Sequence, residues 1–254
     1  MSDSALVIMA RYPESGKTKT RLAKLYGKAE TAQLYQAFLA DLAHKFANQD
    51  YTLTWSYTPP EVDFATFAQT LLLQASSEMR CFPQQGEGLG DRLLRAFQWT
   101  QAQGFRKTIL ISSDSPQIEP EIIPQASQAL DEVDVVLGPA EDGGYYLIAM
   151  RQPHDLFSGI VMSTSSVLAE TIALAQRQNL TTRLLTPCFD IDEIQDLQRL
   201  VDLLQYKPEL APLTASLLAT QLESKRSFFS DDNDTSNKGR APTTFDLYRA
   251  DQPL

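Results

Sequence analysis

The chain has 254 residues, 43% of them hydrophobic, which is enough for one large domain or one domain with an appendage. Its 32 acidic residues outnumber its 22 basic residues and give a net charge of -10, which argues against a nucleic-acid partner because such a partner needs a basic face. Its two cysteines, Cys81 and Cys188, lie far apart in sequence, so we expect no disulfide scaffold, no cysteine zinc site and a reducing, cytoplasmic setting.

The first predicted element is a buried strand at residues 5–10, where six apolar residues follow one another. Asp3, and no basic stretch, precedes this run, and no later run is long enough to cross a bilayer. The sequence therefore predicts neither a signal peptide nor a membrane span.

A cationic loop directly follows this predicted strand. One acidic residue, Glu14, stands there among six basic ones, a net charge of +5; the basic residues are Arg11, Lys17, Lys19, Arg21, Lys24 and Lys28. A solvated, lysine-rich helix face is one interpretation of such a run. Because the run begins where a buried strand ends and passes through Pro13 and Gly16, a phosphate-binding loop between a strand and a helix is the alternative that we favour.

Strands and helices then alternate along the chain. Further strands are predicted at residues 51–57, 108–112, 133–137, 145–149 and 181–185, and helices at residues 29–47, 64–73, 89–103, 119–130, 164–178 and 192–205. This alternation predicts an α/β fold with three layers, α/β/α, around a mostly parallel mixed sheet. Ligands in such folds bind at the carboxyl ends of the strands.

The composition changes near residue 224, where polar residues begin to dominate and no apolar period remains. We therefore predict one folded nucleotide-binding domain over residues 1–223 and a flexible tail over residues 224–254.

Several common enzyme motifs are incomplete. Gly16-Lys17-Thr18 looks like the end of a P-loop, but Arg11 stands where the first glycine of that motif belongs. The glycines at 86, 88 and 90 miss the dinucleotide-binding fingerprint, since its third glycine would fall at Asp91. The chain has only two histidines and no G-x-S-x-G element, which excludes a multi-histidine zinc site and argues against an α/β-hydrolase.

Carboxylates stand where several predicted strands end. Asp114 follows the strand at residues 108–112, and Asp142 lies in a loop with two glycines. Asp190 and Asp192 follow the last predicted strand. A single aspartate in such a place is usually a turn former or a helix cap, but three sites converging on one sheet edge indicate oxygen ligands for Mg²⁺ or Mn²⁺. With the cationic loop, they predict a metal-assisted site for a nucleotide diphosphate.

Six short motifs occur in a fixed order between residues 6 and 204. They are A-R-x-P-x-x-G-x-x-K-T-R-L at residues 10–22, Q-x-G-x-x-L-G-x-R at 84–92, S-D-x-P at 113–116, G-P-A-x-D-G-G-Y at 138–145, S-T at 163–164 and D-x-D at 190–192. In these motifs the sequence resembles the DUF2064 family of GT-A-like proteins, described as glycosyltransferases and associated with radical-SAM and selenodomain gene clusters. Gly88 and Met162 depart from the residues common in that family, which concerns acceptor contacts more than the metal site.

The resemblance implies a GT-A-like, nucleotide-diphospho-sugar transferase fold and a set of site residues. Asp114 and Asp142 would be catalytic, and with Asp192 they would bind the divalent cation. The nucleotide and its phosphates would contact Ala10, Arg11, Gly16, Lys17, Lys19, Arg21, Gln84, Gly86, Gly90 and Arg92. The acceptor side would include Glu141, Gly143, Gly144, Tyr145, Ser163 and Thr164.

The function that we expect is metal-dependent glycosyl transfer from a nucleotide-diphosphate sugar to a small-molecule acceptor whose identity the sequence leaves open. The alternative is a nucleotidyltransferase that uses a nucleoside triphosphate and releases pyrophosphate, because Lys19-Thr-Arg-Leu22 resembles the triphosphate-binding segment of related guanylyltransferases. A nucleotide-binding module without catalysis is a third possibility. Fold resemblance alone does not choose among these functions.

Overall fold

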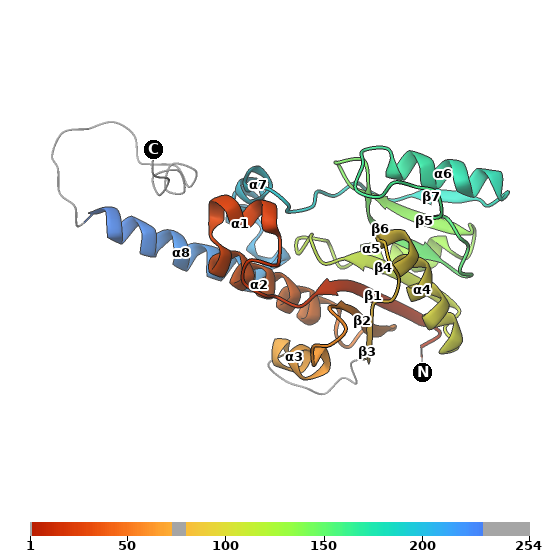
Figure 1. The fold of residues 1–254 in the computed structure, drawn as a ribbon, viewed down its shortest axis with the longest axis horizontal. Coiled ribbons are helices and arrows are strands. Elements are labelled where there is room, and N and C mark those ends of the chain that lie inside the picture. Colours follow the sequence, from red (N-terminus) through yellow and green to blue (C-terminus); the bar gives the residue numbers. More distant parts are fainter. Residues whose placement is uncertain (1, 73–79, 231–254) are drawn as a thin grey trace. The chain divides into compact units, whose positions relative to one another are not determined.

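The computed structural model describes residues 2–72 and 80–230 (Figure 1). Its chain divides into two compact units. Unit 1 comprises Met1–Tyr12 and Leu42–Asp190, and unit 2 comprises Pro13–Asp41 and Ile191–Leu254.

Unit 1 is built on a seven-stranded sheet with the strand order β3-β2-β1-β4-β6-β5-β7. The strands are β1 Ser4–Arg11, β2 Thr52–Thr58, β3 Arg80–Pro83, β4 Lys107–Ser112, β5 Val135–Pro139, β6 Tyr145–Met150 and β7 Thr182–Leu184. Strand β6 runs antiparallel to β4 and β5, and the other neighbouring strands pair in parallel. The predicted mostly parallel mixed sheet is therefore confirmed.

Helices cover both faces of this sheet. The helices that lie wholly in unit 1 are α3 Phe64–Leu71, α4 Leu89–Ala102, α5 Ile122–Ala129 and α6 Val167–Arg177. Ala5 and Val7 of β1 belong to one core cluster with residues of α4 and α6. Leu6 and Ile8 alternate with them and are also fully buried, so the opposite face of the strand is covered as well.

The opposite face carries α3 and α5. Phe64 of α3 stacks on Tyr57 of β2 with ring centroids 4.9 Å apart, and Tyr57 lies beside Ala10 in the parallel register. On the same face, Lys107 of β4 donates from Nζ to the carbonyl of Ser127 in α5 at 2.8 Å. The predicted three-layer α/β/α arrangement is thus confirmed in unit 1.

One edge of the sheet collects the motif-bearing loops of unit 1. Strands β1 to β5 and β7 end at this edge, and the antiparallel β6 begins there. We call it the carboxyl edge; its loops include residues 84–88 after β3, residues 113–118 after β4, residues 140–144 between β5 and β6, and residues 185–190 after β7.

Unit 2 is helical. It holds α1 Thr20–Tyr26, most of α2 Lys28–Phe46, α7 Ile194–Tyr206, the short 3₁₀ helix Pro208–Leu210 and α8 Pro212–Ser230. The buried carboxylate of Asp41 accepts hydrogen bonds from the amides of Leu213 (2.9 Å) and Thr214 (2.8 Å), which satisfies the first turn of α8. Helix α8 runs past the predicted boundary at residue 223, and most of the predicted tail lies outside the described residues. Across the described chain, no helix combines the length and the hydropathy that a membrane crossing requires.

Candidate functional site

Asp114 lies in the first turn after β4, and the serine before it ties this turn to β1. The hydroxyl of Ser113 donates to the carbonyl of Met9 at 2.8 Å. The amide of Asp114 donates to Oγ of Ser112 at 3.3 Å. The Asp114 side chain is half-buried at the carboxyl edge, so its surroundings are fixed from two strands.

Asp190, the last residue of unit 1 in the sequence, contacts the same turn. Its Oδ1 accepts a hydrogen bond from the hydroxyl of Ser115 and another, at 3.5 Å, from the hydroxyl of Ser112. Because these two serines stand on either side of Asp114 in the sequence, the half-buried Asp190 contacts the turn that carries the half-buried Asp114. The metal-binding role was predicted for Asp192, because the D-x-D spacing alone gives no reason to prefer Asp190.

The segment before Asp190 is joined to the neighbouring loops. Nε2 of Gln117 donates to the carbonyl of Phe189 at 2.6 Å. The amide of Cys188 donates to the carbonyl of Pro139 at 3.0 Å, and the amide of Glu141 donates to the carbonyl of Cys188 at 3.1 Å. The loops after β4, β5 and β7 therefore form one connected surface.

Lys45, which sequence reasoning missed, supports the Asp114 turn from helix α2. Its Nζ donates to the carbonyls of Pro116 and Ile118, both at 2.6 Å. A turn at the end of a strand leaves such carbonyls without partners, and a buried carbonyl needs one. No local signal in the sequence distinguishes Lys45 from a lysine on a solvated helix face.

Asp142 lies in the turn between β5 and β6, and its Oδ1 accepts a hydrogen bond from the amide of Gly144 at 2.9 Å. Gly143 has a φ of 93°, and a Cβ placed on it would lie 2.1 Å from the carbonyl oxygen of Ser165. The amide of Leu168 donates to the carbonyl of Gly143 at 2.9 Å. The start of α6 therefore packs directly on the Asp142 loop, and Gly143 permits this close approach.

The predicted acceptor-side residues have different surroundings. Glu141 is exposed, as are Ser163 and Thr164 in the loop before α6. Tyr145 instead packs against the core cluster beneath α6, and burial raises the pKa of its hydroxyl. Within this set, Tyr145 is the side chain that the core of unit 1 holds most firmly.

Two residues of the Q-x-G-x-x-L-G-x-R motif stabilise the carboxyl edge. Nε2 of Gln84 donates to the carbonyls of Ala10 (3.2 Å) and Ser56 (2.9 Å), which links the ends of β1 and β2 to the loop after β3. Nε of Arg92 donates to the carbonyl of Gly86 at 3.2 Å and closes that loop on the first turn of α4. Both side chains are thus engaged by backbone carbonyls.

Gly90 allows the first turn of α4 to pack closely. A Cβ placed there would lie 2.9 Å from Cε of Met162 and 3.0 Å from Cβ of Phe157. The loop before α6 therefore rests on the start of α4.

The predicted phosphate-binding cations divide between the two units. Arg11, the last residue of β1, is exposed in unit 1. In unit 2, Lys17 forms an exposed ion pair with Glu14 at 2.8 Å, and Lys19 and Arg21 both pair with Asp192. A single site that includes these cations together with Asp114 and Asp142 stays a prediction.

The carboxylates at the carboxyl edge suit a Mg²⁺ ion whose other ligands are phosphates and water. Among the described residues, no group of three or more His, Cys, Asp or Glu side chains would hold a metal ion without help. Mg²⁺ is usually bound by one or two carboxylates, with substrate phosphates and water as its other ligands. Asp114 and Asp190 fit that demand, because Asp114 lies in the turn whose serine hydroxyls hold the Asp190 carboxylate.

Both cysteines are shielded thiols. Burial, with a smaller contribution from the Asp190 carboxylate, raises the pKa of Cys188 to about 11, and burial raises the pKa of Cys81 to about 11. Because the thiolate is the reactive form, labelling by a disulfide reagent at pH 8 should be roughly 100-fold slower in the folded protein than in denaturant. Equal labelling rates in the two states would contradict this environment.

The raised pKa values of the two thiols should also lower the free energy of unfolding above about pH 9, because thiols in the unfolded chain then release protons that the folded chain keeps.

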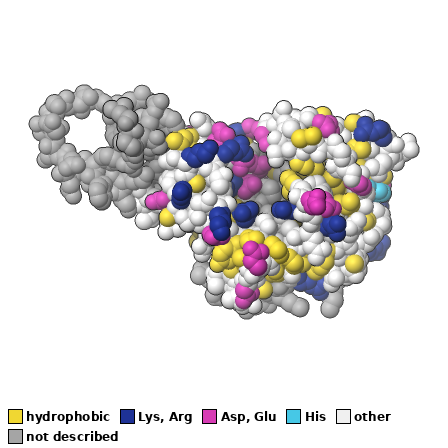
Figure 2. All heavy atoms as spheres, viewed as in Figure 1, with side chains coloured by type: hydrophobic (Ala, Val, Ile, Leu, Met, Phe, Trp, Pro, Cys, Tyr) yellow, Lys and Arg dark blue, Asp and Glu magenta, His cyan; other side chains and the backbone are white. Residues whose placement is uncertain are grey.

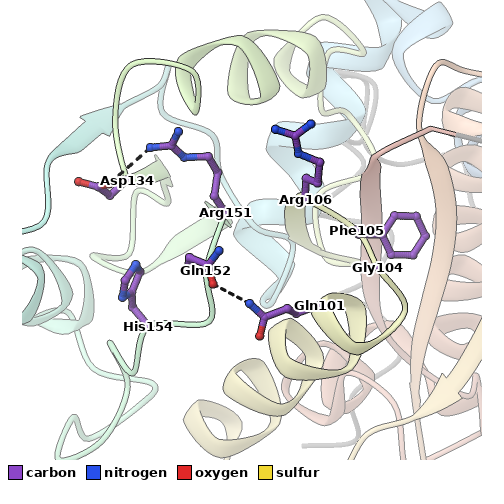
Figure 3. Close-up of a pocket in the computed structure, with 8 residues that line it drawn as sticks. All are labelled: Gln101, Gly104, Phe105, Arg106, Asp134, Arg151, Gln152 and His154. Atoms are coloured by element: carbon purple, nitrogen blue, oxygen red, sulfur yellow. Dashed lines mark hydrogen bonds and ion pairs between the residues drawn. The ribbon is translucent and has the colours of Figure 1, made fainter.

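A cavity of about 390 Å³ opens at the opposite edge of the unit 1 sheet (Figure 3). Its polar side chains largely pair with one another: Arg151 with Asp134 at 3.5 Å, and Gln101 with Gln152 at 2.6 Å. The six residues of β4 place this cavity about 20 Å from the Asp114 turn. Its lining contains none of the predicted site residues, so it does not belong to the candidate site.

Comparison with known proteins relates the chain to nucleotide-dependent transferases. The model of a family described as an uncharacterized protein conserved in bacteria, DUF2064, matches residues 31–164. A crystal structure from Desulfovibrio desulfuricans G20, described provisionally as a nucleotide-diphospho-sugar transferase, is 31% identical with a TM-score of 0.79 and covers 92% of this chain and 100% of its own.

Two further relatives are enzymes by name. A phosphoenolpyruvate guanylyltransferase from Chloroflexus aggregans is 27% identical over 186 residues, which cover 71% of this chain and 89% of that protein. A cytidylyltransferase from Leptospira borgpetersenii is 14% identical with a TM-score of 0.52, covering 92% of this chain and 100% of its own, and shows likeness of fold alone.

Proposed function

Because this chain belongs to the DUF2064 family of bacterial proteins, we propose that it is a transferase that transfers the glycosyl group of a nucleotide-diphosphate sugar to a small-molecule acceptor. The observation that carries the proposal is that the Asp190 carboxylate accepts hydrogen bonds from Ser112 and Ser115, on either side of Asp114, at the carboxyl edge of unit 1. The 31% identical relative supports it, because the provisional description of that protein names this class of donor.

Asp114 and Asp190 would hold a divalent cation together with the phosphates of the donor. Such a cation supplies positive charge against the negative charge that develops on the leaving nucleotide diphosphate. Asp142 would join this set from the neighbouring loop.

The protein's own residues would bind and orient the donor. Ser112 and Ser115 fix the orientation of the Asp190 carboxylate, and Lys45 keeps the Asp114 turn in place. Arg11 stands at the end of β1 and would bind a phosphate oxygen. Carboxylates and cations that are held in position before the donor arrives do not have to reorganise during the reaction, which is the main source of electrostatic catalysis.

Nucleotidyl transfer is the second candidate, and the guanylyltransferase relative favours it. In that reaction a nucleoside triphosphate would give its nucleotidyl group to a phosphorylated or carboxylated acceptor and release pyrophosphate. Both reactions need a cation and positive side chains around a chain of phosphates, so the same site residues serve either donor.

One binding and product assay separates the two reactions. With Mg²⁺ or Mn²⁺ present, thermal unfolding is measured with UDP- and GDP-sugars, nucleoside diphosphates and nucleoside triphosphates, since a ligand at 100 times its Kd adds about 2.7 kcal/mol. We expect nucleotide sugars to stabilise most and a nucleoside diphosphate to be released on turnover. Stronger stabilisation by triphosphates, followed by release of pyrophosphate, would reject glycosyl transfer in favour of the second candidate.

A further inference from the structure

In unit 2, the start of α1 lies beside the start of α7, and oppositely charged side chains meet there. Lys19 and Arg21 belong to the K-T-R-L motif, and Asp192 and Glu193 directly precede α7. Figure 2 shows basic side chains next to acidic ones over these helices. We call these four residues the K-R-D-E cluster.

Lys19 is the buried member of the K-R-D-E cluster, with 5% of its side chain exposed. Its Nζ donates to the carbonyl of Ile191 at 2.6 Å and lies 3.4 Å from Oδ1 of Asp192. The backbone of Lys19 is left-handed, with φ 44° and ψ 55°, a conformation that is unfavourable for a residue other than glycine. The side-chain contacts help to hold Lys19 in this conformation.

Asp192 bridges both cations, because each of its carboxylate oxygens serves one of them. Oδ1 faces Lys19, and Oδ2 lies 2.7 Å from Nη2 of Arg21. The amides of Asp192 and Glu193 both donate to Oδ2 of Asp196, at 3.1 and 2.8 Å, within the capping box of α7. The start of the helix therefore fixes the position of the Asp192 carboxylate.

Arg21 is held more loosely than Lys19. Its side chain is 62% exposed, and it also contacts Oε1 of Glu193 at 3.2 Å. Exposed ion pairs contribute little net stability, so a phosphate oxygen can replace a carboxylate of this pair without a large penalty. Arginine also offers several N–H groups in a fixed fork, which allows it to keep one partner while binding another.

We propose that Asp192 is a positioning residue that holds Lys19 and Arg21 in place to receive phosphate oxygens, and that it does not bind a divalent cation. Both of its oxygens are already engaged by cations, whereas Asp190 is oriented by serine hydroxyls. The inference concerns phosphate binding within unit 2 and rests on the proposed function, which requires a phosphate-bearing ligand.

The test uses Asp192→Asn in the full chain, with inorganic pyrophosphate as the probe in calorimetry without metal. Loss of the bridge should weaken pyrophosphate binding roughly tenfold, the size of one charge-assisted hydrogen bond. In turnover, the KM for the donor should rise by a similar factor while kcat and the metal concentration for half-activation stay nearly unchanged. Asp192→Glu, which keeps the carboxylate, should restore part of the affinity.

Asp202→Asn is the matched control, because Asp202 lies on the same helix and contacts Gln198 at 2.9 Å, outside the K-R-D-E cluster. It should bind pyrophosphate as the wild type does. Arg21→Gln is a second variant in case Asp192→Asn does not fold, since an exposed side chain is tolerated well. It should also bind pyrophosphate roughly tenfold more weakly.

The outcomes are distinct. Tighter or unchanged pyrophosphate binding by Asp192→Asn would overturn the inference, because the carboxylate would then not hold the cations in place for phosphate. If Asp192→Asn does not fold, unchanged binding by Arg21→Gln would overturn it. A raised metal requirement with unchanged pyrophosphate affinity would make Asp192 a metal ligand instead. Wild-type protein that binds neither pyrophosphate nor any nucleotide would overturn the proposed function itself, and this inference with it.

Discussion

Replacing Asp114 by asparagine should lower kcat by roughly 10² to 10³, the usual effect of removing one preorganised electrostatic group from an active site. The amide keeps the shape of the side chain but loses the negative charge that a divalent cation needs. Because the turn is held by Ser113 and Lys45, the fold should keep its stability. Turnover and thermal unfolding of the same preparation measure both quantities.

The matched control is Asp131→Asn, which removes the same charge from unit 1 at a site far from Asp114. Asp131 follows α5 and pairs with Lys107 at 2.7 Å, with 64% of its side chain exposed. Its loss should leave activity unchanged and cost at most about 1 kcal/mol of stability. If both variants keep full activity and the same metal dependence, Asp114 does not bind the cation.

The largest stability effect should come from Gly143→Ala in the Asp142 loop. An alanine there meets two penalties: a left-handed backbone at φ 93° and a Cβ that would lie 2.1 Å from the carbonyl oxygen of Ser165. Together they should cost about 2–5 kcal/mol, because the obstacle is backbone and cannot turn away as a side chain can. The midpoint of urea unfolding, at an unchanged m-value, measures this loss.

Gly159→Ala separates the two penalties. Gly159 has a similar φ of 82°, but nothing lies within 4 Å of a Cβ placed on it. The strain of the backbone alone should therefore cost about 1–2 kcal/mol. Equal losses at the two glycines would mean that the start of α6 does not press on the Asp142 loop.

The central strands were predictable because their burial on both faces leaves continuous apolar runs. β1 and β4 match the predicted ranges within one residue at each end. The strand β3, Arg80–Pro83, was missed since it has four residues, pairs with β2 alone and shows no period of its own. A strand so short is defined by its neighbour more than by its sequence.

The helices of unit 2 show the same limit. The first helix, α1, has seven residues within the cationic stretch, which the sequence analysis treated as a loop. The first turn of α8 depends on Asp41, which is remote in sequence, to satisfy its amides. In unit 1, the predicted start of α5 at residue 119 moves to Ile122 because turns built on Pro116 and Pro120 come first.

The candidate site was predictable to the level of loops. The family and the α/β fold inferred from six motifs are confirmed, and Asp114 and Asp142 do follow the ends of their strands. The choice between Asp190 and Asp192 depends on tertiary contacts: the first meets Ser112 and Ser115, and the second meets two cations. Residues two apart in a loop carry no local signal of which way each side chain points.

A crystal structure with bound nucleotide and Mn²⁺, recorded at a wavelength where manganese scatters anomalously, tests the central claim most directly. We predict one anomalous peak within coordination distance, about 2.2 Å, of oxygens from both Asp114 and Asp190, with the phosphates of the nucleotide as further ligands. An ordered nucleotide whose Mn²⁺ lies away from both carboxylates would contradict the account.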